Sequence, residues 1–313
     1  MTFYKQPKFM PFIKLPKSFC ASISDELLIF TICINLLFAG FNSIPRYYYA
    51  NMLSLTNMGF GILSIFYVIK HFNEKILIRV PLYVMLGQFA DLFDGRAAEK
   101  FGSTKNGEMF DDVADFTSFG VATSALIFKF LKVDIELPTI LAAILAMGYL
   151  VAVVYRLVRF VVNKRKAGVK TGVAIFQGLP SPAGSAFMIT VTCLFEIYEP
   201  SWAKYIYITV LALICWLTVS YVPYPHMGRT ISKVMSKKVK GIYGAYFFLC
   251  MITAVVYKQF KPILALICVS VSLYLISPLF NNKIHLYEKY NKKVAEQTEE
   301  SGSDIGTNFV PEK

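Results

Sequence analysis

DLFDGRAAEKFGSTKNGEMFDDVADFTSFG, residues 91–120, places five aspartates between two apolar runs of the chain. The run before it contains IRVPLYVMLGQFA, and the run after it begins VATSALIFKF. An ionised aspartate at the centre of a bilayer costs roughly 2.5–3.5 kcal/mol on insertion scales. If both runs lie in lipid, so many carboxylates at their junction indicate a function for the charge.

The composition of the whole chain indicates that both runs do lie in lipid. Of the 313 residues, 56% are hydrophobic and 17% are charged. The apolar residues form runs of about 18–25, the length that a helix needs to cross a bilayer core. These runs lack the alternation of a closed barrel, the other structure that satisfies backbone polar groups in lipid. We therefore predict an all-α, polytopic transmembrane helical bundle with about eight spans, at 48–71, 76–94, 110–130, 136–162, 182–198, 203–221, 242–257 and 261–280.

Charge and polarity divide the chain into four predicted parts. Residues 1–47 are a basic interfacial segment with one short apolar helix near 27–41, and whether that helix crosses the membrane stays open. The other three parts are a six-helix core at 48–221, a basic loop with two further spans at 222–281, and a disordered polar tail at 282–313.

Two basic loops predict the orientation of the bundle. The loops at 163–181 and 222–241 carry several lysines and arginines and no acid, so the positive-inside rule places them in the cytoplasm. With eight spans, the N-terminus, the loop at 95–109 and the C-terminal tail share that side. The net charge of +12 is then explained by topology, and we expect no nucleic acid as a partner.

The spacing of the aspartates predicts a shared site. Asp91 and Asp94 are three residues apart at the end of one predicted span, and Asp111 and Asp115 are four apart at the start of the next, so each pair shares a helix face. Asp112 is turned about 100° away from Asp111. Four converging carboxylates repel one another, and hard oxygen ligands favour a divalent cation such as Mg²⁺, Mn²⁺ or Ca²⁺. The alternative is a solvated acidic loop with ordinary helix caps.

Glycines beside the aspartates indicate what such a metal site would bind. Gly95 and Gly107 allow the backbone to approach a ligand closely. A pair of metal ions beside a glycine-lined cleft neutralises a pyrophosphate, and a spare carboxylate can accept a proton. The pattern therefore predicts phosphoryl or phosphatidyl transfer at a membrane surface.

The same residues carry a family resemblance. Asp91-x₂-Asp94-Gly95-x₂-Ala98, followed by Gly107-x₃-Asp111-x₃-Asp115, resembles the signature of the CDP-alcohol phosphatidyltransferase family. The chain departs from that signature at Glu99, where the family has arginine, and its spacer to Gly107 is one residue short. Five further segments resemble the phosphatidylserine synthase subgroup: DGR at 94–96, SFGVA at 118–122, RLVRF at 156–160, GLPSPAG at 178–184 and SYVPYP at 220–225.

The resemblance implies a reaction and its residues. CDP-diacylglycerol binds with its pyrophosphate on two Mg²⁺ or Mn²⁺ ions held by the four aspartates, and the hydroxyl of serine attacks the phosphorus attached to diacylglycerol, releasing CMP. Asp115 is the expected general base, because an unassisted hydroxyl is a poor nucleophile at pH 7; its alternative role is that of a metal ligand only. The expected substrate-binding residues are Gly95, Arg96, Ala98, Gly107, Ser118, Arg156 and Arg159.

Arg156 and Arg159 are three residues apart and share a helix face, where an arginine suits a lipid phosphate or the carboxylate of serine. Alternatively, both are topological markers that reach to the membrane surface.

Partners and location follow from the same resemblance. We expect CDP-diacylglycerol, serine and membrane lipid as partners, and a homodimer is left open. The expected location is integral, in a bacterial inner (cytoplasmic) membrane, with the active site facing the cytoplasm. Two alternatives remain: a family member that uses inositol, glycerol phosphate or choline as acceptor, and a cation transporter. A transporter would hold its ionisable residues near mid-membrane, whereas these acids gather at one face.

Overall fold

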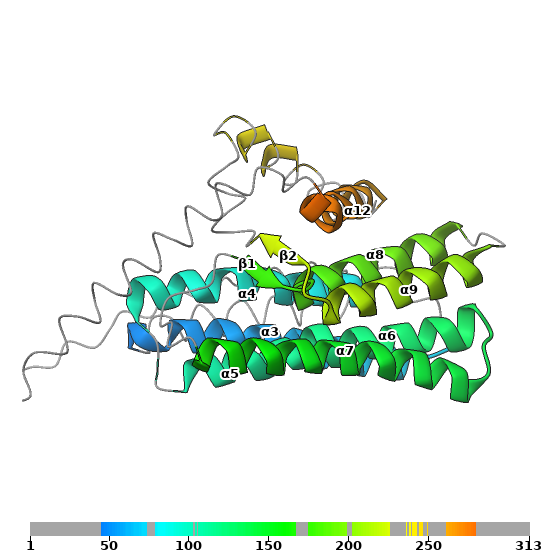
Figure 1. The fold of residues 1–313 in the computed structure, drawn as a ribbon, viewed down its shortest axis with the longest axis horizontal. Coiled ribbons are helices and arrows are strands. Elements are labelled where there is room, and N and C mark those ends of the chain that lie inside the picture. Colours follow the sequence, from blue (N-terminus) through cyan, green and yellow to red (C-terminus); the bar gives the residue numbers. More distant parts are fainter. Residues whose placement is uncertain are drawn as a thin grey trace, which may run out of the picture.

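The computed structural model in Figure 1 describes most of the predicted bundle. It covers residues 45–73, 79–102, 104, 106–166, 175–198, 202–225, parts of 236–249, and 261–279. Four predicted features lie wholly or mostly outside the described residues: the interfacial segment at 1–47, its apolar helix at 27–41, the span at 242–257 and the tail at 282–313.

The described chain is almost entirely helical, which confirms the predicted all-α class. A short 3₁₀ helix, η1 (Arg46–Tyr48), leads into α3 (Tyr49–Lys70). The other helices are α4 (Arg79–Phe101), α5 (Gly107–Asp115), the π-helical η2 (Phe116–Ala122), α6 (Thr123–Lys129), the π-helical η3 (Phe130–Asp134), α7 (Thr139–Lys166), α8 (Ser181–Tyr198), α9 (Ala203–Val219) and α12 (Lys261–Ile276). The antiparallel strands β1 (Ile175–Gln177) and β2 (Pro223–Pro225) form a small ribbon.

Four described helical stretches are long and apolar enough to cross a bilayer: Arg46–Lys70, Gly107–Asp134, Thr139–Asn163 and Pro262–Leu279. The second joins α5, η2, α6 and η3 into one continuous helix. A shorter apolar helix covers Lys204–Val219. The count of eight spans stays a prediction.

The connection between α4 and α5 is shorter than the sequence predicts. The expected loop spans 95–109, but α4 continues to Phe101 and α5 begins at Gly107. RAAEKF contains good helix formers, so nothing stops α4 before Gly102, whose φ of +87° ends the helix in the left-handed region that glycine adopts readily. Asp91 and Asp94 therefore lie within α4 and not at its end.

Helix α3 lies at the centre of the half of the bundle that carries the aspartates. It packs along α4 and also against α5 and η2 (Figure 1). Two glycines make this packing close: a Cβ at Gly61 would lie 2.5 Å from Ser118 Oγ, and one at Gly87 would lie 2.8 Å from Asn57 Oδ1. Larger side chains at either position would force the helices apart.

Two buried apolar clusters hold the bundle together. The larger joins η3, α7, α8 and α9 around Leu131, Tyr149, Tyr207 and Ile214. The smaller joins α3, α4, η2 and α8, with Phe119 at its centre. Large apolar side chains on the outer faces of the helices remain exposed, as expected where the neighbouring solvent is lipid.

A buried ion cluster lies at the far end of the continuous helix from α5. The side chain of Lys129 is fully buried, and its Nζ contacts Glu196 Oε1 at 2.8 Å and Asp134 Oδ2 at 2.9 Å. Lys129 follows Asp115 by fourteen residues, a rise of about 20 Å along a helix. This ion cluster and Asp115 are therefore near opposite ends of the continuous helix.

Candidate active site

The α4–α5 connection positions the first elements of the site. Gly102 turns the chain out of α4, with its N–H donating to Ala98 O at 3.0 Å. Thr104 then exchanges hydrogen bonds with Asn51 of α3, at 2.9 and 3.2 Å. Gly107 N–H donates to Thr104 O at 3.1 Å and α5 starts there. This short connection, fixed to α3, brings the aspartate-bearing parts of α4 and α5 together.

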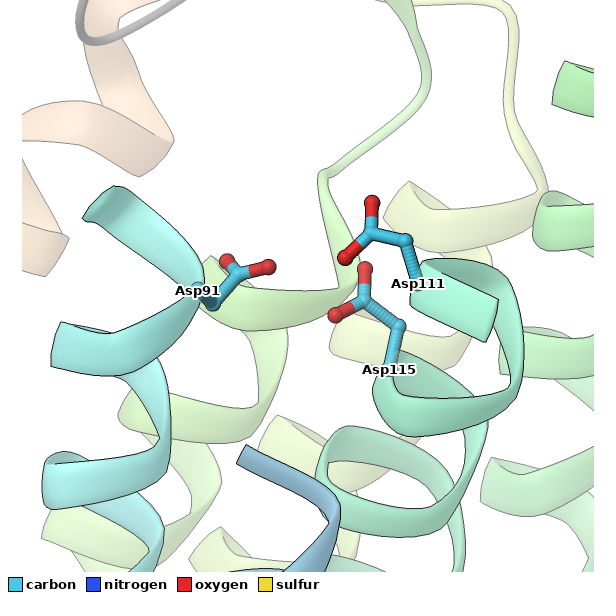
Figure 2. Close-up of side chains that lie close together, drawn as sticks. All are labelled: Asp91, Asp111 and Asp115. Carbon is cyan, nitrogen blue, oxygen red and sulfur yellow. The ribbon is translucent and has the colours of Figure 1, made fainter. Parts of the chain in front are cut away.

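Three of the predicted aspartates converge between these helices. Asp91 on α4 faces Asp111 and Asp115 on α5 (Figure 2), and one carboxylate oxygen of each lies within 4.8 Å of the others. All three side chains are half-buried. The helical spacing read from the sequence thus places Asp111 and Asp115 on one face, as predicted.

The fourth aspartate lies deeper and belongs to the same network. Asp94 is buried, and its Oδ2 accepts a hydrogen bond from Ser54 Oγ at 2.9 Å. The same hydroxyl lies 3.4 Å from Asp111 Oδ1, so Ser54 of α3 bridges the aspartates of α4 and α5. Three of the four predicted carboxylates therefore face one another, and the fourth, Asp94, is linked to Asp111 through Ser54.

Asn57 contacts Asp115 from the same face of α3. Its Nδ2 donates to Asp115 Oδ1 at 3.3 Å, while its own Oδ1 is buried with no hydrogen-bond partner among the described residues. Leaving a buried acceptor unsatisfied costs about 1–3 kcal/mol. An unsatisfied buried group of this kind calls for an explanation, and a functional role is one such explanation.

Arg156 supplies positive charge beside the aspartates. It is 6% exposed on α7 and interacts electrostatically with Asp115. Its Nη1 donates to Ser181 Oγ at 3.1 Å, at the start of α8, and its guanidinium lies 5.7 Å from the ring of Phe160 and 5.4 Å from that of Phe176. A buried guanidinium held in this way is oriented to receive an anionic group.

The aspartate cluster fits a divalent cation. Two unit charges about 4 Å apart repel by about 1 kcal/mol in water and about 4 kcal/mol near a protein surface, so three converging carboxylates need more compensation than one arginine gives. Arg96 and Lys100 of α4 lie over the rings of Phe93 and Phe101. An ion with metal–oxygen distances of roughly 2.0–2.6 Å spans oxygens about 4–5 Å apart, which matches the cluster. The ligand set, carboxylates alone, suits Mg²⁺, Mn²⁺ or Ca²⁺.

The motif residues of α4 line its more open part. Gly95 and Arg96 are exposed and Ala98 is half-buried. A Cβ at Gly95 would meet no atom within 4 Å, so this position leaves room beside the helix. The side chain of Glu99 lies outside the described residues.

Two residues expected to bind substrate have protein partners that favour structural roles. Ser118 is fully buried and donates to Asn57 O at 2.8 Å, which joins η2 to α3. Arg159 donates to backbone carbonyls of Gln177 at 2.7 Å, Ser220 at 2.9 Å and Thr218 at 3.3 Å, and also to Val219 O. Arg159 therefore ties β1 to the C-terminal end of α9, whereas Arg156 interacts electrostatically with Asp115.

The sequence interpretation did not include Ser54, Asn57 and Ser181. A signal for the first two was present: Asn51, Ser54 and Asn57 recur every three residues in an otherwise apolar span, which puts them on one helix face. Ser181 lies in GLPSPAG, which carries part of the subgroup resemblance, but its contact with Arg156 was not predictable because it joins two helices that are distant in sequence.

Comparison with known proteins agrees with this geometry. The model of the CDP-alcohol phosphatidyltransferase family matches residues 47–222, which is more than half of the chain and contains α3 to α9. The chain belongs to the CDP-alcohol phosphatidyltransferase family. It is an integral membrane enzyme of phospholipid biosynthesis that transfers phosphatidyl groups, in a family that generally depends on divalent metal.

Two bacterial relatives have the same printed name, CDP-diacylglycerol–serine O-phosphatidyltransferase. The Bacillus subtilis (strain 168) protein is 28% identical over 183 residues, covering 57% of this chain and 90% of the relative. The Helicobacter pylori (strain ATCC 700392 / 26695) protein is 26% identical over 189 residues, covering 59% of this chain and 75% of the relative.

Proposed function

We propose that this protein transfers the phosphatidyl group of CDP-diacylglycerol to the hydroxyl of serine and releases CMP. The observation that carries the proposal is the convergence of Asp91, Asp111 and Asp115 from α4 and α5 with the buried Arg156 beside them. The relatives named for the serine reaction support serine as the acceptor.

The proposed roles of the aspartates follow from their positions. Asp91, Asp94, Asp111 and Asp115 would hold a pair of Mg²⁺ or Mn²⁺ ions, which would neutralise the pyrophosphate of the CDP-lipid when bound. Asp115 would accept the proton of the acceptor hydroxyl as the hydroxyl oxygen bonds to the phosphorus attached to diacylglycerol. The bond between that phosphorus and the CMP oxygen breaks, and its electron pair leaves with CMP.

The other motif residues would bind the nucleotide lipid. Gly95, Ala98 and Gly107 leave space along α4 and the start of α5, where the pyrophosphate and nucleotide would lie, and Arg96 would add positive charge. The fourfold hydrogen bonding of Arg159 supports a role in holding β1 and α9, which keeps Arg156 and Ser181 in place.

Arg156 is the proposed site for the carboxylate of serine. It is a buried cation beside the proposed base, and a carboxylate bound there would bring the β-hydroxyl of the same small molecule toward Asp115. The phosphate of the CDP-lipid is the alternative ligand. The two assignments differ in which Michaelis constant depends on Arg156.

An acceptor assay tests the proposal. Membranes that contain the protein are incubated with labelled CDP-diacylglycerol, Mg²⁺ or Mn²⁺, and one of four alcohols: serine, inositol, glycerol phosphate or choline. We expect a labelled lipid, phosphatidylserine, and release of CMP only in the reaction that contains serine. If another alcohol gives the labelled lipid, that alcohol and not serine is the acceptor. If none of the alcohols gives a labelled lipid, the proposed function is contradicted.

Kinetics of Arg156→Gln extend this test to the acceptor site. We expect KM for serine to rise about tenfold or more, since a charge-assisted hydrogen bond is worth about 1.5–3 kcal/mol, while KM for CDP-diacylglycerol changes little. A selective rise in KM for CDP-diacylglycerol would assign Arg156 to the lipid phosphate. Arg159→Gln is the comparison variant: because Arg159 holds β1 and α9 through backbone carbonyls, its loss should lower stability without a selective rise in KM for either substrate.

The proposed topology places the active site at the cytoplasmic face of a bacterial inner membrane. Helix α7 runs back from η3, so its basic C-terminal end, Lys164–Lys166, lies at the same end of the bundle as the aspartates. The division of the chain into four parts, with a core at 48–221, is also part of the proposal. The proposal holds for a monomer and for a homodimer.

A further inference from the structure

We propose that Ser54 and Asn57 of α3 are positioning residues for the aspartates, Ser54 for Asp94 and Asp111, and Asn57 for Asp115. The proposal rests on the function proposed above. The aspartate motif lies on α4 and α5. The proposal adds α3, whose side chains would hold aspartates of both pairs in position.

The contacts of Ser54 connect the two halves of the motif. Its hydroxyl lies 2.9 Å from Asp94 Oδ2 on α4, 3.4 Å from Asp111 Oδ1 on α5, and 3.2 Å from Ala50 O in its own helix. The hydroxyl has one proton and three acceptors in reach, so it can move from one carboxylate to the other without rearrangement. Ser54 thus offers one hydrogen bond that either carboxylate can accept, which favours a close approach of Asp94 on α4 to Asp111 on α5.

Asn57 controls the orientation of Asp115. Its Nδ2 donates to Asp115 Oδ1, and one carboxylate oxygen of Asp115 lies within 4.8 Å of an oxygen of Asp91 and of Asp111. An aspartate that alternates between rotamers would present its basic oxygen to the acceptor hydroxyl only part of the time. Holding one oxygen removes that freedom before the substrate binds.

The surrounding packing is adapted to this contact. Gly87 leaves room for the Asn57 amide, since a Cβ there would lie 2.8 Å from Asn57 Oδ1. Ser118 donates to Asn57 O at 2.8 Å, and Gly61 allows that approach. Three residues on three elements thus hold one buried asparagine against one aspartate. Asn57 Oδ1 has no hydrogen-bond partner among the described residues, so the side-chain hydrogen bond of this amide is the one that Nδ2 donates to Asp115.

Kinetics of purified variants at saturating Mg²⁺ or Mn²⁺ test the proposal. We expect Asn57→Leu, which keeps the branching and the number of heavy atoms and removes the amide, to lower kcat about tenfold to a hundredfold, because misplacement by about 1 Å costs up to a hundredfold. KM for CDP-diacylglycerol should stay within about twofold. Ser54→Ala should lower kcat and raise the metal concentration needed for half-maximal rate. Ser54→Thr keeps a hydroxyl, so both quantities should stay near their wild-type values. The matched control is Ser64→Ala, because Ser64 is buried on the same helix and its hydroxyl donates to Phe60 O at 2.9 Å, one turn back in that helix.

A double-mutant cycle separates positioning from mere packing. If Asn57 acts through Asp115, Asn57→Leu should have little further effect in an Asp115→Asn background. Equal losses in both backgrounds would overturn the proposal, as would a wild-type kcat in Asn57→Leu. Asn57→Ser repeats the cycle with a smaller side chain if the leucine variant does not fold. An inactive wild-type enzyme in the same assay would contradict the proposed function instead.

Discussion

The carboxylates of Asp91 and Asp111 meet across two helices, so in the proposed metal site each would contribute to the charge balance around the cation. We predict that Asp91→Asn and Asp111→Asn each reduce the rate of lipid product formation more than tenfold at saturating metal, which corresponds to a loss of over about 1.4 kcal/mol. The rates are to be measured in membranes with equal amounts of inserted protein.

Asp112→Asn is the control for that prediction. Asp112 neighbours Asp111 in the sequence but lies outside the three-carboxylate cluster. Its substitution should have a mild effect. A rate above about a tenth of the wild-type value in either cluster variant would remove that aspartate from the metal site.

Asp115 has two proposed roles, and metal titration distinguishes them. If Asp115 is the general base, Asp115→Asn should bind CDP-diacylglycerol and metal nearly normally, because three other carboxylates remain, while kcat falls by roughly 10²–10⁴. Raised Mg²⁺ or Mn²⁺ should not restore the rate. Full rescue at high metal would show that Asp115 is only a ligand and that another group accepts the proton.

Among the helices, the sequence predicted some features well and missed others for identifiable physical reasons. The spacing within one helix fixes which side chains share a face, so the pairing of Asp111 with Asp115 was predictable from the 3.6-residue period alone. The end of α4 was not, because the polarity of RAAEKF suggested a loop while its helix propensity favours continuation. Contacts between helices, such as those of Ser54 and Arg159, depend on packing that no local pattern encodes.

The buried ion cluster of α6, η3 and α8 gives a prediction at the scale of these elements. Lys129→Met should lower the temperature of half-inactivation by several degrees, because it leaves Glu196 buried without its cation, a change that costs about 3–5 kcal/mol in buried ion pairs. At low temperature kcat should be nearly unchanged, since Asp115 lies about 20 Å away along the helix. The measurement is residual activity after heating in detergent.

The double variant Lys129→Met/Glu196→Gln is the control for this cluster. It removes the acid together with the cation, so part of the lost stability should return. Equal losses in the single and double variants would mean that the packing of the lysine stem, and not the charge, stabilises this end of the bundle.

Across the whole molecule, the two charged clusters occupy different ends of the continuous helix 107–134, and only the aspartate end carries the basic C-terminus of α7. This asymmetry fits the proposed function, in which the reacting groups would face one aqueous compartment while the apolar outer faces stay in lipid. Sequence charge alone predicted the side, but the structure adds that α7 brings Arg156 to the same end.

The orientation can be tested with reporter fusions. A fluorescent protein that folds only in the cytoplasm should fluoresce when fused after residue 166 or after residue 313, because the positive-inside bias places both positions on that side. Alkaline phosphatase, active only outside, should be active when fused after residue 134, at the opposite end of the helix that starts at Gly107. An N-terminal fluorescent fusion decides whether 27–41 spans, since a ninth span would export residue 1 without changing the other results. Phosphatase activity after residue 166 would contradict the proposed cytoplasmic site, because it would place the C-terminus of α7, and with it the aspartate cluster, on the outer face.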